Sequence, residues 1–199
     1  MNDIRPVFSR KLPLGRFDTY TQRPSFSFIE VKQIHKKNFF QVPIREGEDM
    51  CADGIYTFDK GYKIPLCIKT ADCLPVAVIG KKGVAMIHAG WRGIARGILI
   101  GGEMKEIMAE YFFIGPHISG ETYEVKDDFK RVFPDSPHFL KIGQKIFFNL
   151  AAEACRQINS VFPEAKVENC NICTYSHADL HSFRREKNHK QSNWNILTL

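Results

Sequence analysis

Residues 70–93, with the sequence TADCLPVAVIGKKGVAMIHAGWRG, constrain the fold more than any other part of the chain. An apolar run at residues 74–79 follows Cys73, and a second apolar run at residues 84–87 leads into His88. The segment between them, residues 80–83, begins and ends with glycine and predicts a hairpin loop. Because the start of one antiparallel strand lies beside the end of the next, we expect Cys73 and His88 to meet at one edge of a sheet.

The remaining pattern predicts one α+β domain over residues 1–199, with more strands than helices. Apolar runs between turn residues indicate strands, which we expect at residues 26–31, 55–57, 64–69, 112–114, 166–172 and 195–199. Near-helical spacing of apolar residues indicates helices at residues 94–110, 125–133 and 146–161. The acidic segment 45–49 predicts a loop, and residues 52–54 predict a turn.

Composition narrows the class of protein. No segment of the 199 residues approaches the length of a membrane span, and the N-terminus lacks the apolar core of a signal peptide. The six cysteines are sparse and irregularly spaced, which indicates reduced thiols and a cytoplasmic protein. The net charge is +6, but the basic residues are scattered, which favours a small anionic substrate such as phosphate over nucleic acid.

A cysteine beside a histidine has two chemical uses and one structural alternative. The pair is either a nucleophilic thiolate with its base or part of a zinc site, and otherwise it is a buried thiol and a hydrogen-bonded histidine. Asp72 and Arg92 place charges beside the pair, which a simple strand end does not require. These charges favour a functional site.

Two neighbouring features extend this candidate site. Gly90 and Gly93 flank Trp91 and Arg92, as expected where backbone comes close to a ligand. His35 follows another predicted strand and can complete a Cys-His-His set. Three protein ligands with one open position form the usual catalytic zinc arrangement.

Other motifs give weaker signals. A single CxxC, formed by Cys170 and Cys173, is more typical of two packed thiols than of a metal or redox site. The segment GPHISG at residues 115–120 predicts either an anion-binding loop or a plain turn. His177, His181 and His189 lie in a polar tail, where solvated side chains or a mobile lid are favoured over a metal cluster.

Several motifs resemble those of the YfiH-like, laccase-domain family, which is variously described as polyphenol oxidases and purine nucleoside phosphorylases. They occur in family order and cover about residues 26–199. The matching elements are QIH at 33–35, ADG at 52–54, TADCLPV at 70–76, HAGWRG at 88–93, IGPHIS at 114–119, YEV at 123–125, CT at 173–174 and SFRR at 182–185.

The resemblance implies an α/β/β/α sandwich shared with deamidating toxins that use a Cys-His pair. It also implies a metal site of His35, Cys73 and His88, with zinc favoured over copper because the seven histidines form no His-x-His pair. The implied partners are phosphate and a purine nucleoside, and the expected oligomeric state is a monomer or weak dimer. The remaining expected site residues are Asp72 and Arg92 for catalysis and Gln33, Trp91, Gly115, His117 and Arg184 for substrate binding.

The implied activity is phosphorolysis of adenosine, inosine, guanosine and methylthioadenosine, accompanied by adenosine deamination. Three alternatives stay open. A metal-free Cys-His hydrolase would cleave an amide in a peptidoglycan precursor, and a nucleoside-binding protein would hold its ligand without turnover. Copper-dependent phenol oxidation is the least favoured.

Overall fold

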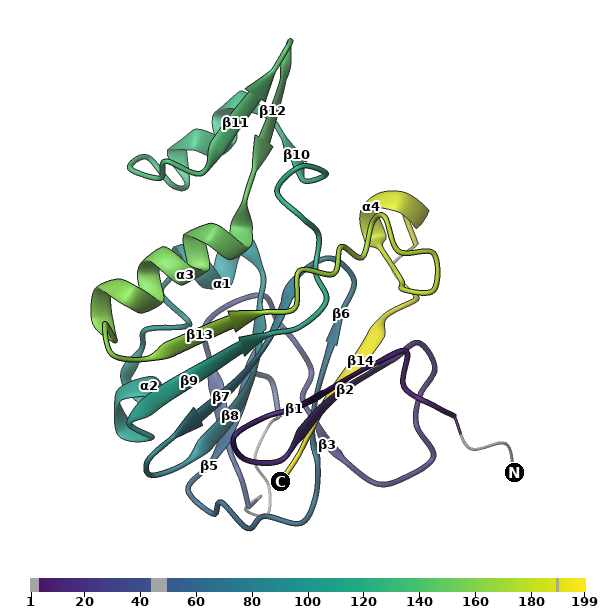
Figure 1. Cartoon of the computed structure of the whole chain (residues 1–199), viewed down its shortest axis with the longest axis vertical. Coiled ribbons are helices and arrows are strands. Elements are labelled where there is room, and N and C mark those ends of the chain that lie inside the picture. The colour runs from purple at the N-terminus through teal and green to yellow at the C-terminus, as the bar shows by residue number, and fades with distance from the viewer. Residues whose placement is uncertain (1–3, 44–49, 189) are drawn as a thin grey trace.

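The computed structural model describes residues 4–43, 50–188 and 190–199, and its main body consists of two stacked sheets (Figure 1). The predicted loop at residues 45–49 lies outside the described residues. The larger sheet has six strands in the spatial order β13 (Lys166–Asn169), β9 (Ala109–Ile114), β7 (Leu74–Gly80), β8 (Val84–Ala89), β5 (Gly54–Thr57) and β4 (Phe39–Gln41).

The second sheet joins the two ends of the chain. Its five strands lie in the order β1 (Phe8–Lys11), β2 (Arg16–Tyr20), β14 (Asn193–Thr198), β6 (Leu66–Thr70) and β3 (Ile29–Glu30). A small third sheet of β10 (Glu124–Val125), β12 (Lys145–Phe148) and β11 (Phe139–Ile142) projects from the main body (Figure 1).

Helices are few and short. They are α1 (Trp91–Ala95), α2 (Gly102–Glu106), α3 (Leu150–Val161), α4 (Phe183–Glu186) and a 3₁₀ helix, η1 (Asp127–Arg131). In Figure 1, α1, α2 and α3 lie on one side of the six-stranded sheet, and the five-stranded sheet lies on the other. Parallel and antiparallel pairs occur in both large sheets. The predicted α+β class with mixed sheets is therefore confirmed.

The β7–β8 hairpin is the centre of the molecule. Every residue of both strands is buried, because one face packs on the five-stranded sheet and the other packs under the helices. Strands covered on both faces have continuous apolar sequences, and this explains why the hairpin was the clearest signal in the chain. Each fully buried large apolar side chain contributes about 1.5–3 kcal/mol. The register pairs Pro75 with His88, so the predicted hairpin is confirmed.

The predicted helix at residues 94–110 is wrong. The structure has two short helices there, because Gly97 adopts a φ of +75° and turns the chain after α1. Residues 109 and 110 already belong to β9. The apolar spacing persists because both helices bury side chains, among them Ile94 and Met104, against the same face of the sheet.

The predicted helix at residues 146–161 begins later than expected. Residues 146–148 form the end of β12, and Asn149 then caps α3 by accepting a hydrogen bond from the backbone N–H of Ala152 at 2.9 Å. The predicted helix at residues 125–133 is the shorter η1, and the strands predicted at 26–31 and 166–172 shorten to β3 and β13. Six strands were not predicted, namely β1, β2, β4, β10, β11 and β12.

Candidate metal centre

Three side chains converge at the open end of the β7–β8 hairpin. The sulfur of Cys73 and one ring nitrogen each from His35 and His88 lie within 4.8 Å of one another. Cys73 occupies the turn between β6 and β7, and His88 lies near the end of β8. The predicted meeting of Cys73 and His88 at one sheet edge is therefore confirmed, and His35 joins them.

The buried carboxylate of Asp53 organises this group, although the sequence predicted Asp53 only as part of a turn. Asp53 is 0% exposed, and its Oδ1 lies 2.9 Å from Nδ1 of His88. A carboxylate in this position accepts the Nδ1 hydrogen and leaves Nε2 as the ligand atom. The signal in the sequence was an acidic residue at the start of a buried strand that pairs with β8.

Asp53 also holds His35 in place. Its carboxylate accepts the backbone N–H of His35 at 2.9 Å and that of Lys36 at 2.6 Å. These two bonds stabilise an unusual backbone, since His35 has a φ of +55°, a left-handed conformation that non-glycine residues rarely adopt. The His35 ring consequently lies edge-on to that of His88, with their centroids 4.7 Å apart.

Burial and charge act differently on the two imidazoles. Burial opposes protonation of His88, but the Cys73 sulfur and the Asp53 carboxylate outweigh it and raise the pKa of His88 to about 9. Burial and the neighbouring His88 lower the pKa of His35. Burial raises the pKa of Asp53, but hydrogen bonds from His88 and the two backbone N–H groups outweigh it, and the net pKa is lowered. Asp53 therefore stays ionised beside His88.

At Gly90 the backbone passes close to the candidate metal ligands, as the sequence predicts for this segment. A Cβ atom at this position would lie 3.0 Å from the Cys73 sulfur and 3.7 Å from the His88 Nε2. Any other residue would crowd the space between the candidate ligands, so the glycine keeps the sulfur accessible.

The donor set fits a transition metal. A thiolate and two imidazoles are preferred zinc ligands, and the same set also suits copper. The Asp53–His88 hydrogen bond supplies the outer support that such sites use to orient an imidazole. The group could therefore bind a metal ion.

A cavity of about 620 Å³ opens over the three ligands. Aromatic and cationic side chains line it beside the metal-binding group. Trp91 and Arg92 come from α1, with the guanidinium 4.3 Å from the indole centroid, and Arg184 of α4 lies 4.9 Å from the Tyr123 ring. Of these four, Tyr123 was not predicted as a site residue, although the YEV motif contains it.

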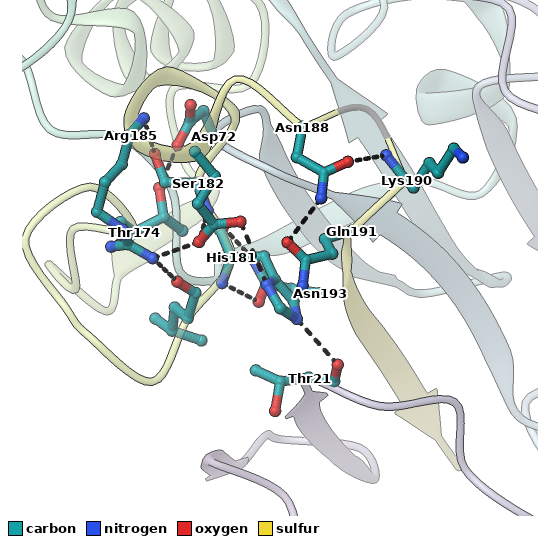
Figure 2. Close-up of polar contacts among 12 residues, drawn as sticks. Thr21, Asp72, Thr174, His181, Ser182, Arg185, Asn188, Lys190, Gln191 and Asn193 are labelled. Carbon is teal, nitrogen blue, oxygen red and sulfur yellow. Dashed lines mark hydrogen bonds and ion pairs between the residues drawn. The ribbon is translucent and has the colours of Figure 1, made fainter.

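Asp72 lines the same cavity, but other parts of the chain bind its carboxylate. Thr174 donates its hydroxyl to Oδ1 at 2.7 Å, and the backbone N–H of Arg184 donates to Oδ2 at 2.7 Å. Figure 2 shows Asp72 beside Thr174 and the segment that contains α4. Asp72 has a φ of +89°, so these bonds hold a strained turn next to Cys73.

Three predicted substrate-binding residues have structural contacts. The Gln33 side chain lines the cavity, but its amide makes two hydrogen bonds with the backbone of Lys69. Gly115 packs against the Phe17 ring, which a Cβ would approach to 2.4 Å. His117 lines a different cavity. The structure therefore brings neither Gly115 nor His117 into the lining of the cavity above the metal-binding group.

Two adjacent arginines have different surroundings. Arg184 lines the cavity and donates to one carbonyl oxygen, that of Glu124, at 2.7 Å. Arg185 instead donates to four carbonyl oxygens, those of Thr174, Tyr175, His177 and Leu180. Arg185 also bonds Glu186 at 2.6 Å. It therefore holds together the loop before α4 (Figure 2).

The histidines of the polar tail do not share one environment. His177 is exposed, while His181 lies 3.1 Å from the carbonyl oxygen of Thr21 and 3.4 Å from Glu186. His189 lies outside the described residues. Among the described residues, one group of three or more potential metal ligands lies close enough together to hold a single ion. It consists of His35, Cys73 and His88.

The fold and this site define a class: an α+β protein with a candidate Cys-His-His metal centre in the lining of an open cavity. Residues 16–195 match the family model described as "Multi-copper polyphenol oxidoreductase laccase". The chain belongs to this laccase-like family, which includes the YfiH proteins.

Several similar proteins have been named. A "Purine nucleoside phosphorylase" of Aquifex aeolicus is 29% identical over 94% of this chain and 89% of its own length. Another of the same name, from Bacteroides thetaiotaomicron, is 34% identical over 64% of this chain, but the match covers 53% of that protein. Among solved structures, a DUF152 protein of Neisseria meningitidis is 28% identical with a TM-score of 0.73, covering 84% of this chain and 73% of its own.

A helix that crosses a bilayer is long and predominantly apolar, and the helices of this chain differ from that pattern. Across the described residues, none combines sufficient length with sufficient apolar character to cross a bilayer.

Proposed function

We propose that this chain is a zinc-dependent purine nucleoside phosphorylase. The observation that carries the proposal is the metal-binding group of His35, Cys73 and His88 beneath a cavity large enough for a nucleoside. The names of the relatives, which match up to 94% of the chain, support the same activity. The proposed partners are a purine nucleoside and phosphate.

Zinc would be held by the Cys73 sulfur and the two imidazole nitrogens. When bound, it supplies a Lewis acid in the cavity. Asp53 keeps His88 in the tautomer that presents Nε2, and Gly90 leaves the space beside the sulfur open. We favour zinc over copper because three ligands with an open position are typical of catalytic zinc.

Phosphorolysis requires an anion held against the ribose anomeric carbon. Phosphate attacks this carbon, the bond to the purine nitrogen breaks, and the purine leaves with the electron pair and takes up a proton. Arg92 and Arg184 line the cavity, and no carboxylate among the described residues pairs with either guanidinium. We assign phosphate binding to these two arginines, since guanidinium groups bind phosphate through paired hydrogen bonds.

The flat base needs aromatic surfaces. Trp91 and Tyr123 both line the cavity, and offset or edge-on ring contacts favour binding of a purine. Such contacts discriminate little among bases, so we propose adenosine, inosine, guanosine and methylthioadenosine as substrates. Adenosine deamination is proposed as a second reaction of the same site.

Asp72 is assigned a positioning role in this scheme. Both carboxylate oxygens accept hydrogen bonds from Thr174 and Arg184, so the group links Cys73 to the segment that carries the phosphate-binding arginine. Gln33 acts similarly through its two bonds with the Lys69 backbone.

The test is to incubate zinc-loaded protein with adenosine and phosphate and to separate adenine, inosine and ribose 1-phosphate by chromatography. Wild type is expected to form adenine and ribose 1-phosphate in equal amounts, and Cys73→Ala is expected to form neither. Cys155→Ala, which alters a half-buried thiol on α3, is the matched control and should retain activity. Equal turnover by wild type and Cys73→Ala would reject the proposal, and tight binding of adenosine without product would favour a binding protein.

One observation favours a second candidate. Cys73, His88 and Asp53 have the residue types and the base–carboxylate contact of a cysteine hydrolase triad, in which the imidazole activates the thiol. Such an amide hydrolase does not need His35 and would retain activity with a chelator. Metal analysis separates these candidates. About one zinc per chain argues for the phosphorylase over the metal-free hydrolase. One copper per chain would instead favour the phenol oxidase named in the family description.

Free thiols are typical of proteins in a reducing compartment. Cys67, Cys73, Cys155, Cys170 and Cys173 are free in the structure, and we propose a cytoplasmic protein on this basis. The expected monomer or weak dimer stays a prediction.

A further inference from the structure

A second cavity, of about 400 Å³, lies apart from the metal-binding group, and its lining shares no residue with that of the first cavity. It lies where the segment after β13 passes the segment after β9, and these two segments are joined by a bridge between His117 and Cys173. The lining includes His117, Ser119, His138, Asn149 and Cys173. The proposed function uses none of these residues.

The thiol of Cys173 has hydrogen-bond donors around it. Its sulfur accepts the backbone N–H of Ser119 at 3.3 Å and lies 3.3 Å from the hydroxyl of Thr122. Burial opposes ionisation, but these hydrogen bonds outweigh it and lower the pKa of Cys173 to about 7. Cys170, three residues earlier, is a natural comparison because burial raises the pKa of its thiol to about 11.

Two histidines line the same cavity, and each has a ring nitrogen without a hydrogen-bond partner among the described residues. His117 is 4% exposed, and its Nδ1 donates to the carbonyl oxygen of Gly115 at 2.8 Å, so Nε2 carries a lone pair. Burial lowers the pKa of His117 and keeps this lone pair available. Neither His117 Nε2 nor the buried Nε2 of His138 has a hydrogen-bond partner within the described residues. A polar ligand in the cavity could bond the buried Nε2 of His138 and so offset the cost of burying this atom without a partner.

We propose that this cavity admits a small hydroperoxide and that Cys173 is the residue it oxidises. The sulfur attacks the terminal oxygen of the peroxide, a sulfur–oxygen bond forms and the oxygen–oxygen bond breaks. The sulfur loses two electrons to the peroxide, and the attacked oxygen passes its proton to the leaving oxygen, which departs as water or an alcohol. The product is a cysteine sulfenate.

The residues around the thiol have separate roles in this step. Ser119 and Thr122 stabilise the attacking thiolate of the half-buried Cys173, and a partly exposed thiolate with such donors is the form that peroxides oxidise. The His117 Nε2 can accept a hydrogen bond from the peroxide hydroxyl. The reaction does not involve the metal-binding group, so it stands or falls independently of the phosphorylase activity.

The test uses the zinc-loaded full chain, treated at pH 7 with one equivalent of hydrogen peroxide in the presence of dimedone, which traps sulfenic acids. Mass spectrometry then gives the labelling rate of each cysteine. Cys173 is expected to be labelled at least about tenfold faster than Cys170, since its larger thiolate fraction outweighs its lower intrinsic nucleophilicity. Equal labelling of Cys170 and Cys173, or labelling confined to Cys73, would overturn the proposal.

A variant tests the role of the donors. Thr122→Val removes one hydrogen-bond donor and is expected to slow labelling of Cys173 several-fold, while Ser160→Ala, which removes an exposed hydroxyl on α3, should leave it unchanged. Dithiothreitol added before dimedone should abolish the label, because sulfenic acid is reducible. A label that dithiothreitol does not prevent would contradict a sulfenate product.

Discussion

Oδ1 of Asp53 lies 2.9 Å from Nδ1 of His88, and the same oxygen accepts the backbone N–H of His35. One buried carboxylate thus orients two of the three candidate metal ligands, which come from segments 53 residues apart in the chain. Asp53 is therefore part of the site, although it is not one of the candidate ligands.

The first prediction concerns this carboxylate. Asp53→Asn keeps the size of the side chain but removes its charge, so the zinc affinity should fall about 10–100-fold, the usual effect of losing such a support. The measurement is a competition titration against a chromophoric chelator. Asp59→Asn, an exposed loop position, is the control, and an unchanged affinity in Asp53→Asn would show that the hydrogen bond to His88 does not matter.

The second prediction concerns the space beside the sulfur. Gly90→Ala would place a methyl group 3.0 Å from the Cys73 sulfur, so zinc binding should weaken while the far-ultraviolet circular dichroism spectrum stays the same. Gly102→Ala is the matched control, because a Cβ there has no neighbour within 4 Å, and it should stabilise α2 by about 0.5–1 kcal/mol. Equal zinc affinity in both variants would contradict the steric argument.

The third prediction separates the two arginines of α4. Arg185→Ala removes hydrogen bonds to four carbonyl oxygens and should lower the free energy of unfolding by about 2–4 kcal/mol. Arg184→Ala should leave the unfolding temperature within a few degrees and reduce kcat/KM for phosphate about 10-fold or more. Thermal unfolding and steady-state kinetics measure the two effects, and the reverse pattern would refute the assignment.

The fourth prediction concerns pH and α3. Glu153 is completely buried, and its carboxylate accepts hydrogen bonds from Ser136, Arg156 and Gln157. Burial raises the pKa of Glu153, but these bonds outweigh it and hold the pKa below the ordinary value of 4.5. Its stabilisation is therefore fully present above about pH 4.5 and is lost as the pH falls through the lower pKa of the folded state.

Glu153→Gln should accordingly cost about 1–3 kcal/mol at pH 7 and remove this part of the acid sensitivity. Urea unfolding at pH 7, 4.5 and 3.5 measures both. Glu110→Gln, at an exposed surface ion pair, serves as the control, and identical pH profiles for wild type and Glu153→Gln would argue against the prediction.

Local signals identified the centre of the fold correctly. Continuous apolar runs, a glycine-bounded loop and the positions of Cys73 and His88 sufficed to predict the β7–β8 hairpin and the meeting of the two side chains. Helical spacing was misleading at residues 94–110, because separate short elements that bury side chains against one sheet face produce the same apolar pattern as a single helix.

Tertiary contacts decided the rest. The sequence by itself determined which residues can form the central hairpin, because burial on both faces leaves a continuous apolar pattern that local reading detects. Only the folded chain decided that Asp53 supports His35 and His88, that β2 near the start of the chain pairs with β14 near its end, and that Cys73 and Cys173 lie in different cavities. These relationships join residues far apart along the chain, and no local pattern of hydrophobicity or spacing records which distant partners will meet.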